Sequence, residues 1–457
     1  MDINTNIFRA YDIRGVAYED LTEEIVSKLG KSLGTSSLNR GETQLIVSRD
    51  GRNSSPQMYE WLSEGIRSTG CDVINIGIAP TPVLYFSTFK LPASSGVMIT
   101  GSHNPSEYNG FKIVRNNKTI SGEAIQEIKL SILENEFLTG KGSEKEEEII
   151  EMYLHELKEN VAISRPLKLA IDCGNGVASI LAKEVYESLG CEVESIFSTL
   201  DGNFPNHHPD PSQPENLKDL IGVVLNKELE IGLAFDGDAD RLGVVSSKGE
   251  IIYPDMQMIL FSKDILANNQ GSKIVFDVKC SKLLSNSISR EGGIPIMSKT
   301  GHSFIKDTIA KESALLGGEM SGHIFFNDKW PGFDDAIYAG ARMLEIISSY
   351  SKNDDILSTL PKLTCTPEIN IKTTDDDKFK IVEKFKSLAN FPNSTLINID
   401  GIRIEFENGW GLLRASNTTP NLVLRFEANN QENLENISND FREILSKIDS
   451  DLAHFQL

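Results

Sequence analysis

Short apolar runs alternate with amphipathic helical patterns along most of this chain. Residues 44–48 are typical of a buried strand, a helical pattern then opens at Ser55-Pro56 and closes at Gly70, and residues 72–76 are typical of the next strand. Proline at the first helical position and glycine just past the end are usual helix boundaries. Strands that alternate with helices predict α/β segments built on parallel sheets.

The alternation recurs, and we expect three comparable α/β segments, although no residue-level repeat is visible. The second segment contains strand-like runs at 167–172, 192–196 and 231–235, and the third contains a strand at 273–277 and a helix at 335–349. After Pro361 and Pro367 the pattern changes. Hairpin-like strands at 402–406 and 422–426 and a last helix from residue 431 predict an α+β unit.

A chain of 457 residues is too long for one core, so several domains are expected. A helix is predicted from Glu123 to about Leu138. The charged stretch 141–148 that follows is typical of a solvated hinge or helix start, and we place a domain boundary there. The predicted domains are 1–148, 149–250, 251–364 and 365–457.

The formal net charge of -21 argues against a nucleic-acid partner and against an anionic membrane surface. An anionic substrate would therefore need local basic groups or a metal. The five cysteines are scattered without a CxxC pair, which indicates reduced thiols. The N-terminus lacks the pattern of a signal peptide, and no apolar run approaches the ~18 residues of a membrane span. We expect a cytoplasmic protein.

The first candidate site is Thr100-Gly101-Ser102-His103-Asn104-Pro105, which follows the apolar run 96–99. Gly101 frees the backbone beside the serine and Pro105 stiffens the exit, so a hydroxyl is presented at the end of a buried strand. Such a serine can act as a nucleophile or carry a phosphoryl group. In isolation the pattern more often marks a capped turn.

The second candidate is Asp236-Gly237-Asp238-Ala239-Asp240-Arg241, directly after an apolar strand. Alternate residues of an extended chain face the same way, so three carboxylates would repel one another unless a hard cation lay between them. Such oxygen ligands suit Mg²⁺. A calcium EF-hand is excluded, because its sixth and twelfth positions would be Arg241 and Ser247. A phosphatase of the haloacid dehalogenase class stays open, although Asp240 departs from its usual pattern.

Two later loops carry side chains suited to ligands. In Gly318-Glu319-Met320-Ser321-Gly322-His323 a carboxylate, a hydroxyl and an imidazole alternate, which suits the hydroxyls of a sugar, although a polar turn explains the segment as well. The segment Arg414-Ala415-Ser416-Asn417-Thr418-Thr419-Pro420 offers a guanidinium, hydroxyls, an amide and backbone N–H groups. It can cradle a phosphate, with a capped turn as an equal alternative.

The segment 172–179 resembles a dinucleotide-binding fingerprint. It places Gly174-Asn175-Gly176 after a strand, with Glu194 twenty residues after the first glycine. Ser179 replaces the third glycine, and a tight strand-to-helix turn occurs in any α/β domain. We favour the structural interpretation.

The four loops, in this order and spacing, resemble those of the α-D-phosphohexomutase family, and within it the bacterial bifunctional phosphomannomutase/phosphoglucomutase branch. The resemblance extends from residues 8–15 (Phe-Arg-Ala-Tyr-Asp-Ile-Arg-Gly) to the loop at Arg414. The haloacid dehalogenase alternative is rejected here, because it explains none of the other three loops.

The resemblance implies an α/β fold of four domains around a central cleft, three with similar mixed α/β cores and a smaller α+β fourth. These would be a phosphoserine-loop domain (1–148), a metal-binding domain (149–250), a sugar-binding domain (251–364) and a phosphate-binding C-terminal domain (365–457).

The resemblance also implies the reversible interconversion of hexose 1-phosphate and hexose 6-phosphate, of mannose and glucose, through a phosphoserine enzyme and a 1,6-bisphosphate. Ser102 would carry the phosphoryl group, and Mg²⁺ would be held by Ser102, Asp236, Asp238 and Asp240. Glucose 1,6-bisphosphate is expected as activator and intermediate. The other catalytic candidates are Arg14, Lys112 and His302, and the last two are candidate acid–base groups, with a plain phosphate contact as an equal alternative. The implied substrate-binding residues are Tyr11, Arg241, Lys279, Gly301, Glu319, Ser321, His323, Arg414, Ser416, Asn417 and Thr418.

Three alternatives remain open. Met320 resembles the mannose/glucose branch, and a phosphoglucosamine mutase, in which Ser321 would face an amino group, is the nearest alternative. A dinucleotide-dependent oxidoreductase would rest on Gly174 and Gly176. A non-catalytic phosphosugar sensor would keep the Arg414 loop and need neither Ser102 nor the aspartates. We expect a monomer that binds phosphosugars and neither nucleic acid nor membrane.

Overall fold

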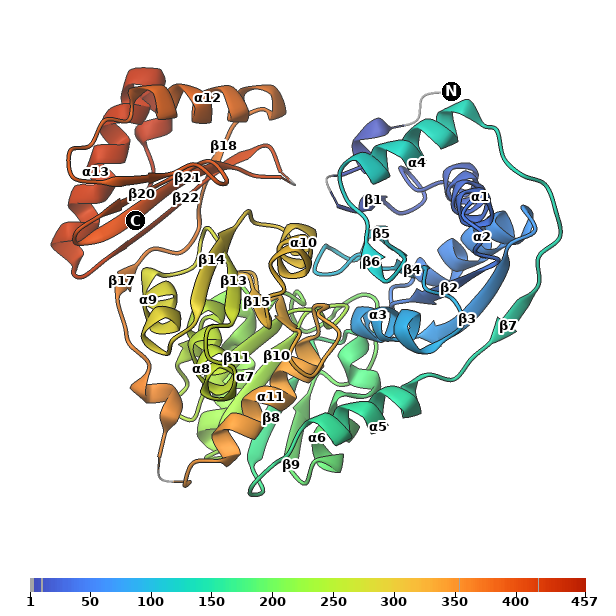
Figure 1. Ribbon diagram of the computed structural model, residues 1–457, viewed down its shortest axis with the longest axis horizontal. Coiled ribbons are helices and arrows are strands. Elements are labelled where there is room, and N and C mark those ends of the chain that lie inside the picture. The colour runs from blue at the N-terminus through green and yellow to red at the C-terminus, as the bar shows by residue number, and fades with distance from the viewer. Residues whose placement is uncertain (1–3, 10, 353, 418) are drawn as a thin grey trace.

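Four separate sheets follow one another along the computed structural model, which describes residues 4–9, 11–352, 354–417 and 419–457. In Figure 1 the first sheet lies at the right in blue, the second and third lie in the middle in green and yellow, and the fourth lies at the upper left in orange and red. The expected fold class, three α/β units followed by a smaller α+β unit, is confirmed.

The first sheet has the strand order β1-β5-β4-β2-β3-β7, with β6 paired to β5. Its strands are β1 (Ile13–Val16), β2 (Gln44–Arg49), β3 (Asp72–Ile78), β4 (Gly96–Ile99), β5 (Tyr108–Arg115), β6 (Lys118–Thr119) and β7 (Glu144–Glu146). Its helices are α1 (Glu23–Asn39), α2 (Ser55–Arg67), α3 (Thr81–Lys90) and α4 (Glu123–Glu134). Strand β2 is parallel to β3 and β4, and β5 is antiparallel to β1 and β4, so the sheet is mixed rather than purely parallel.

Two predicted features of this unit were wrong in detail. The helix from Glu123 ends at Glu134 because Asn135 adopts the left-handed conformation and closes it. The charged stretch 141–148 contains the strand β7, which pairs in parallel with the edge of β3. Glu144 accepts hydrogen bonds from Tyr59 Oη and Ser63 Oγ of α2, so charged side chains are compatible with an edge strand here.

The second and third sheets have the orders β12-β11-β10-β8-β9 and β14-β13-β15-β16. The second unit comprises α5 (Ile150–Asn160), β8 (Lys168–Asp172), α6 (Ala182–Ser188), β9 (Glu192–Ile196), α7 (Lys218–Asn226), β10 (Ile231–Phe235), β11 (Leu242–Ser246) and β12 (Ile251–Ile252). The third comprises α8 (Pro254–Asn268), β13 (Lys273–Asp277), α9 (Lys282–Arg290), β14 (Ile294–Ser298), α10 (His302–Glu312), β15 (Leu316–Gly318), β16 (Ile324–Phe326) and α11 (Ala336–Ser348). Because β12 pairs with β11, the second sheet continues two residues past the boundary predicted at 250.

The fourth sheet is antiparallel throughout, in the order β17-β22-β21-β20-β19 with β18 paired to β22. The elements are β17 (Thr364–Cys365), β18 (Ile369–Lys372), α12 (Asp375–Leu388), β19 (Thr395–Ile397), β20 (Ile402–Phe406), β21 (Gly409–Ala415), β22 (Asn421–Ala428) and α13 (Gln431–Ile448). Short 3₁₀ helices lie at Thr5–Ile7, Val177–Ile180, Pro214–Leu217, Ile356–Thr359 and Ser450–Ala453. Strand β21 lies between the two predicted hairpin strands and ends with Arg414 and Ala415, which we had expected in a loop.

The buried apolar side chains show which units are joined. One core runs through the second and third units and reaches one face of the first sheet, and the other face of that sheet has a core of its own. The C-terminal unit packs its sheet against α12 and α13 around a separate core, and a small buried cluster of Val278, Trp410 and Leu412 joins it to the third unit. Among the described residues, no helix is both long and apolar enough to cross a membrane.

Candidate functional site

Three of the four candidate loops occupy the same position in their sheets. The Ser102 loop joins β4 to β5, the aspartate loop joins β10 to β11, and the Glu319 loop joins β15 to β16. Each loop follows a strand that is parallel to one neighbour and antiparallel to the strand after the loop. All three loops thus leave the carboxyl ends of equivalent strands, where α/β units place ligands. A cavity of about 840 Å³ brings the Ser102 and Glu319 loops together with the Arg414 loop.

Ser102 is buried and has a φ of 49°, in the left-handed region. Its N–H donates to Thr100 Oγ1 at 2.8 Å, its Oγ donates to Asp236 Oδ2 at 3.0 Å, and the same Oγ lies 3.1 Å from His103 Nδ1. A non-glycine residue in this conformation costs about 1–2 kcal/mol. The surrounding contacts must therefore hold the serine in place.

Arg52 provides most of those contacts, which no local sequence pattern indicates. Its buried guanidinium donates to four carbonyl oxygens of one loop, those of Ser102, Asn104, Pro105 and Tyr108, at 2.6–3.0 Å. A Cβ at Gly101 would lie 2.5 Å from Arg52 Cζ. Glycine before the serine is thus required for the arginine to approach the loop.

The aspartate loop lies directly against the serine loop. A Cβ at Gly237 would lie 2.3 Å from the carbonyl oxygen of Ser102. Asp236, Asp238 and Asp240 are buried, and each offers a carboxylate oxygen within 4.8 Å of the other two. Burial raises the pKa of Asp236 well above its ordinary value, and the other two carboxylates raise it further.

The three aspartates fit a hard divalent cation. Asp238 Oδ1 and Asp240 Oδ1 are buried and have no hydrogen-bond partner among the described residues. Asp236 Oδ1 accepts from the N–H groups of Asp240 at 3.0 Å and Arg241 at 3.2 Å, which orients its other oxygen towards Ser102. Unpaired carboxylate oxygens that face one another are suited to Mg²⁺.

Lys112 of β5 lies beside this acidic cluster. Its Nζ is 2.6 Å from Asp238 Oδ2, which also accepts from Thr81 Oγ1 at 2.6 Å, and it contacts Asp240 Oδ2 as well. Burial alone would lower the pKa of Lys112, but Asp238 and Asp240 raise it well above its ordinary value. In this arrangement Lys112 is an ammonium, suited to donate a proton or neutralise a phosphate rather than to accept a proton.

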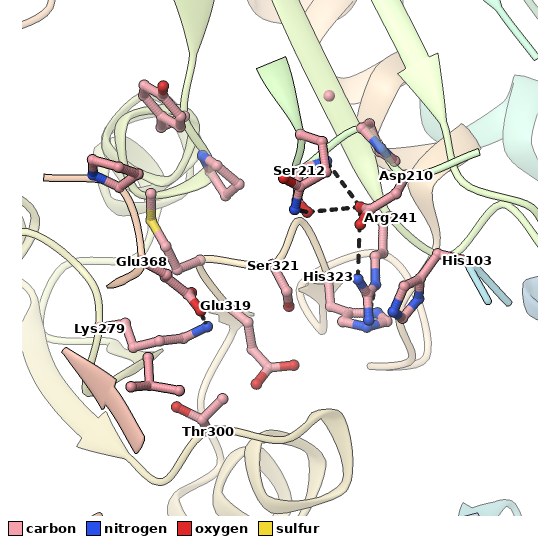
Figure 2. Close-up of a pocket in the computed structure, with 18 of the residues that line it drawn as sticks. His103, Asp210, Ser212, Arg241, Lys279, Thr300, Glu319, Ser321, His323 and Glu368 are labelled. Carbon is pink, nitrogen blue, oxygen red and sulfur yellow. Dashed lines mark hydrogen bonds and ion pairs between the residues drawn. The ribbon is translucent and has the colours of Figure 1, made fainter. Parts of the chain in front are cut away.

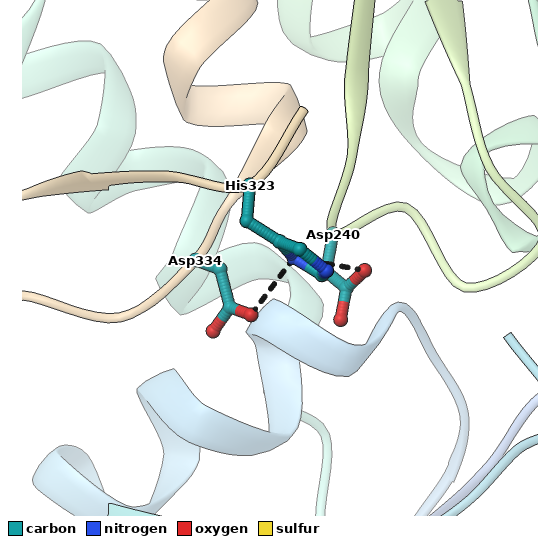
Figure 3. Close-up of side chains that lie close together, drawn as sticks. All are labelled: Asp240, His323 and Asp334. Carbon is teal, nitrogen blue, oxygen red and sulfur yellow. Dashed lines mark ion pairs between the residues drawn. The ribbon is translucent and has the colours of Figure 1, made fainter. Parts of the chain in front are cut away.

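The Glu319 loop lies on the aspartate loop. The N–H of Leu242 donates to the carbonyl oxygen of Gly322 at 3.0 Å, and Arg241 Nε donates to His323 Nε2 at 3.1 Å. Figure 2 shows Arg241 between His323 and Asp210 on one side of the cavity, with Glu319 and Ser321 nearby. On the side away from Arg241, His323 Nδ1 faces Asp334 and Asp240 (Figure 3).

His302 begins α10 and lines the same cavity. Burial lowers the pKa of its imidazole well below the ordinary value, and the charge of Lys306 lowers it further. The ring meets the edge of Tyr11 at a centroid distance of 4.9 Å. His302 is therefore a neutral imidazole that can accept a proton near neutral pH.

The fourth loop lines the same cavity as Ser102. Arg414 Nε donates to Asp400 Oδ2 at 2.9 Å, while Arg414 Nη2 is buried without a hydrogen-bond partner among the described residues. Asn417 Nδ2 donates to the carbonyl oxygen of Thr300 at 3.3 Å, which connects this loop to the start of α10. A buried guanidinium nitrogen that is free to donate suits an anionic oxygen.

Lys279 of the third unit and Glu368 of the fourth unit form an ion pair at the wall of the cavity. Lys279 Nζ lies 2.5 Å from Glu368 Oε1 (Figure 2). Burial alone would lower the pKa of Lys279, but Glu368 and Asp277 raise it. Lys279 is thus a charged group at the cavity wall.

The glycine turn at 174–176 is part of the structure around the aspartate loop. A Cβ at Gly176 would lie 2.8 Å from the carbonyl oxygen of Gly237, and the N–H of Val177 donates to that oxygen at 3.2 Å. The carboxylate oxygen Oδ2 of Asp172 lies 2.9 Å from Nε2 of His207. The turn packs against protein rather than opening onto the cavity.

The structure gathers the predicted site residues that it describes. Fourteen of them line the cavity: Tyr11, Arg14, Ser102, Lys112, Arg241, Lys279, Gly301, His302, Glu319, Ser321, His323, Arg414, Ser416 and Asn417. The three aspartates lie behind Ser102 and Lys112, and Thr418 lies outside the described residues. Sequence reasoning missed the residues that support them, Arg52, Thr81, Asp334, Glu368 and Asp400, because isolated polar residues give no local signal.

The comparisons with known proteins agree along the whole chain. Models of the phosphoglucomutase/phosphomannomutase family match as α/β/α domain I (residues 5–139), domain II (151–249), domain III (253–363) and the C-terminal domain (368–444). A phosphomannomutase/phosphoglucomutase of Pseudomonas aeruginosa is 49% identical over 448 residues, which cover 98% of this chain and 97% of the relative. A phosphoglucomutase of Neisseria gonorrhoeae is 47% identical over 447 residues, with 97% of each chain covered.

A solved structure agrees as closely. The crystal structure of a phosphoglucomutase/phosphomannomutase family protein from Burkholderia thailandensis superposes with a TM-score of 0.94 at 43% identity, over 98% of both chains. Four consecutive domain matches, near-complete coverage and this shared fold lead to one conclusion: the chain belongs to the phosphoglucomutase/phosphomannomutase family of phosphohexomutases.

Proposed function

We propose that this chain interconverts the 1-phosphates and 6-phosphates of mannose and glucose through phospho-Ser102 and a hexose 1,6-bisphosphate. One observation carries the proposal. Ser102 Oγ, 3.0 Å from Asp236 Oδ2, and the unpaired Nη2 of Arg414 belong to the same cavity, which can hold a sugar with a phosphate at each end.

Phosphoryl transfer requires positioning and charge neutralisation more than covalent help. In the first half-reaction the bond between Ser102 Oγ and phosphorus breaks as a free sugar hydroxyl bonds to that phosphorus. His302, the neutral imidazole at the cavity wall, accepts the hydroxyl proton and returns it in the second half-reaction. Lys112 and Arg14 neutralise charge at this end of the cavity.

Mg²⁺ held by Asp236, Asp238, Asp240 and the phosphate on Ser102 would neutralise charge on the transferring group. The three aspartates fit this ion, because their carboxylate oxygens converge and those of Asp238 and Asp240 include one unpaired oxygen each. Two of them are also neutralised by Lys112.

The bisphosphate then turns end for end, and its other phosphate returns to Ser102. Arg414, Ser416 and Asn417 anchor the phosphate that is not transferred, while Glu319 and Ser321 bind the sugar hydroxyls. Thr418 is proposed in the same loop from the sequence alone. The separate core of the C-terminal unit supports this step, because a mobile phosphate loop can accept either end of the sugar.

The basic residues of this site explain how a chain with a net charge of -21 can bind an anionic substrate. Arg14, Lys112, Arg241, Lys279 and Arg414 line one cavity, so it attracts phosphates although the whole chain is acidic. Phosphosugars are the proposed substrates and glucose 1,6-bisphosphate the proposed activator.

The four units are proposed as the four domains of the enzyme, working as a cytoplasmic monomer. In chain order, the four units would carry the phosphoserine, bind the metal, bind the sugar and bind the phosphate that is not transferred. The proposed boundaries follow residues 148, 250 and 364; β12, which pairs with the second sheet, lies just past the second of them, and β17, which pairs with the fourth sheet, begins at the third.

The decisive experiment measures kcat/KM for mannose 1-phosphate, glucose 1-phosphate and glucosamine 1-phosphate, with Mg²⁺ and a trace of glucose 1,6-bisphosphate. Comparable values for the first two and a far lower value for the third are expected. A preference for glucosamine 1-phosphate would identify a phosphoglucosamine mutase with the same mechanism. Absence of turnover with all three would contradict the proposal.

A further inference from the structure

Residues 197–213 connect β9 to the 3₁₀ helix at Pro214–Leu217, and over these described residues there is no helix or strand. A loop of this length inside a compact unit usually has a function. Its first part lies on the first unit and its last part lines the cavity, so we call it the bridging segment. None of its residues is among the predicted site residues.

The first part of the bridging segment covers the arginine that holds the serine loop. The ring centre of Phe204 lies 5.0 Å from the guanidinium carbon of Arg52, and Asn203 Oδ1 accepts a hydrogen bond from Asn53 Nδ2 at 2.8 Å. An aromatic face at this distance attracts a guanidinium. Because Arg52 donates to four carbonyl oxygens of the Ser102 loop, the bridging segment supports that loop from the second unit.

The last part of the bridging segment reaches Arg241 in the cavity. Asp210 Oδ1 accepts from the N–H of Ser212 at 3.1 Å and from its Oγ at 2.7 Å, and it lies 4.0 Å from Arg241 Nη1 (Figure 2). A buried carboxylate at this distance attracts the guanidinium. The segment thus contacts one arginine that supports the serine loop and another that lines the cavity.

The glycine turn at 174–176, which resembles part of a dinucleotide fingerprint, holds the middle of the bridging segment. The N–H of Asn175 donates to the carbonyl oxygen of Phe197 and its Nδ2 donates to that of Thr199, both at 2.8 Å. Its Oδ1 accepts from Asn206 Nδ2, also at 2.8 Å. The turn therefore anchors this segment, a role that its resemblance to a nucleotide motif did not suggest.

His207 is a second anchor, and its contacts fix its charge. Its Nε2 lies 2.9 Å from Asp172 Oδ2, and its Nδ1 lies 2.9 Å from the carbonyl oxygen of His208. Carboxylate and carbonyl oxygens accept, so only the imidazolium can donate to both. Burial alone would lower the pKa of His207, but the hydrogen bond and the charge of Asp172 raise it above its ordinary value.

We propose that His207, as an imidazolium paired with Asp172, is a positioning residue for phosphoryl transfer. It holds the bridging segment in place, and the segment keeps Arg52 against the serine loop and Arg241 at the cavity wall. When the ring loses a proton, one of its two acceptors faces a nitrogen lone pair and the segment loosens. The inference rests on the proposed function, because its effect is read as phosphosugar turnover.

The sign of the pH dependence follows from these contacts. They are complete while His207 is protonated, and they are lost as the pH rises through its raised pKa. The titratable groups that face His207 are Asp172, Asp219 and His208. Positioning by His207 should therefore contribute to kcat at neutral pH and fade at higher pH.

Asp172→Asn should reverse this dependence. The amide oxygen can accept from the N–H of Gly174 as Asp172 Oδ1 does, and the amide nitrogen can donate to His207 Nε2, so the neutral ring keeps both contacts. The kcat of the variant divided by that of wild type, measured with glucose 1-phosphate and Mg²⁺, should rise about tenfold from about pH 6 to pH 9. The ratio cancels the titration of groups that both proteins share.

His207→Gln should weaken the anchor at every pH, because one amide nitrogen replaces two ring donors. Its kcat should be about tenfold below wild type near pH 6.5, and the difference should shrink as the pH rises. Hydrogen exchange at neutral pH should become faster in residues 198–206 and in the Ser102 loop. His155→Gln, at an exposed position of α5, is the control and should match wild type in both measurements.

The outcomes separate this inference from the proposed function. With an active wild type, a constant ratio for Asp172→Asn across the pH range would overturn the inference alone, and so would wild-type kcat and exchange in His207→Gln. A loss of kcat in His207→Gln that follows its melting temperature and is equal at every pH would also overturn it, because it would indicate a purely structural role. If Asp172→Asn does not fold, His207→Gln decides. A wild type without turnover would overturn both proposals.

Discussion

Ser102 shows how single residues from different domains form one site. Its hydroxyl meets Asp236 across the interface between the first and second units, and its backbone is held by Arg52, which lies fifty residues earlier in the chain. Lys112 crosses the same interface to Asp238 and Asp240. The chemistry of each side chain is ordinary, and its role comes from the neighbour that it meets.

Replacing Ser102 by alanine should abolish most turnover, by at least about a thousandfold, because no hydroxyl remains to carry the phosphoryl group. Binding of glucose 1-phosphate, measured by calorimetry, should change little. Ser106→Ala, at an exposed position of the same loop, is the control and should behave as wild type. Near-normal activity of Ser102→Ala would remove the basis for a phosphoserine mechanism.

Asp238→Asn should raise the Mg²⁺ concentration needed for half-maximal activity by about tenfold or more, since one ligand charge is lost. The fold should survive, because Asp240 still pairs with Lys112. A magnesium titration of the steady-state rate measures the effect, with the exposed Asp219→Asn as control. An unchanged magnesium requirement would count against the aspartates as ligands.

The secondary-structure elements explain why the loops converge. In each α/β unit the functional loop connects a strand that has a parallel neighbour to the next strand, which is antiparallel. The three loops therefore occupy equivalent positions in their sheets, although their side chains differ. No residue-level repeat accompanies this topological repeat. Packing needs only the same pattern of apolar strands, so the side chains of the loops are free to differ.

Gly237→Ala tests the contact between two of these loops. Its Cβ would meet the carbonyl oxygen of Ser102 at 2.3 Å, so the backbone must shift, at a cost of about 1–3 kcal/mol in the free energy of unfolding. We expect a loss of kcat beyond the loss of stability. Gly222→Ala, in helix α7 with open space around it, should instead stabilise the protein by about 0.5–1 kcal/mol. Thermal unfolding and steady-state kinetics of both variants check the prediction, and a fully active Gly237→Ala would contradict it.

At the scale of the whole molecule, the completeness of the site depends on how the C-terminal unit packs against the third unit. Arg403 of β20 donates to the carbonyl oxygens of Val278 and Cys280 in the third unit, and its guanidinium lies 3.8 Å from the centre of the Trp410 ring. Glu368 reaches Lys279 across the same junction. These contacts join the unit that carries the Arg414 loop to the third unit.

Arg403→Met should loosen this junction, because it leaves two buried carbonyl oxygens without their donor and Glu405 with Lys282 as its remaining cation. KM for glucose 1-phosphate should rise about tenfold, since the Arg414 loop is less often in place. Limited proteolysis around residues 361–368 should become faster. The surface variant Lys183→Ala, far from this segment, should change neither quantity, and an unaltered KM in Arg403→Met would show that the domain position is set elsewhere.

The order of strands and helices, the four candidate loops and their chemical character follow from the sequence, because apolar periodicity and the spacing of glycines, hydroxyls and carboxylates are local properties. The resemblance of those loops to one family gave the site residues their expected roles. Local patterns also misled in places: the charged segment 141–148 contains a strand, and Arg414 ends one, because pairing with β3 and β22 outweighs local preference.

The supporting residues could not be found in this way. Arg52, Asp334 and Glu368 are ordinary charged residues in the sequence, and they matter because the fold buries or aligns them against groups that lie ten to ninety positions away. The protonation states of Lys112 and His302 likewise depend on burial and on charges from other units. Local patterns specify which groups a chain can offer, whereas long-range packing sets the distances and charges under which those groups react.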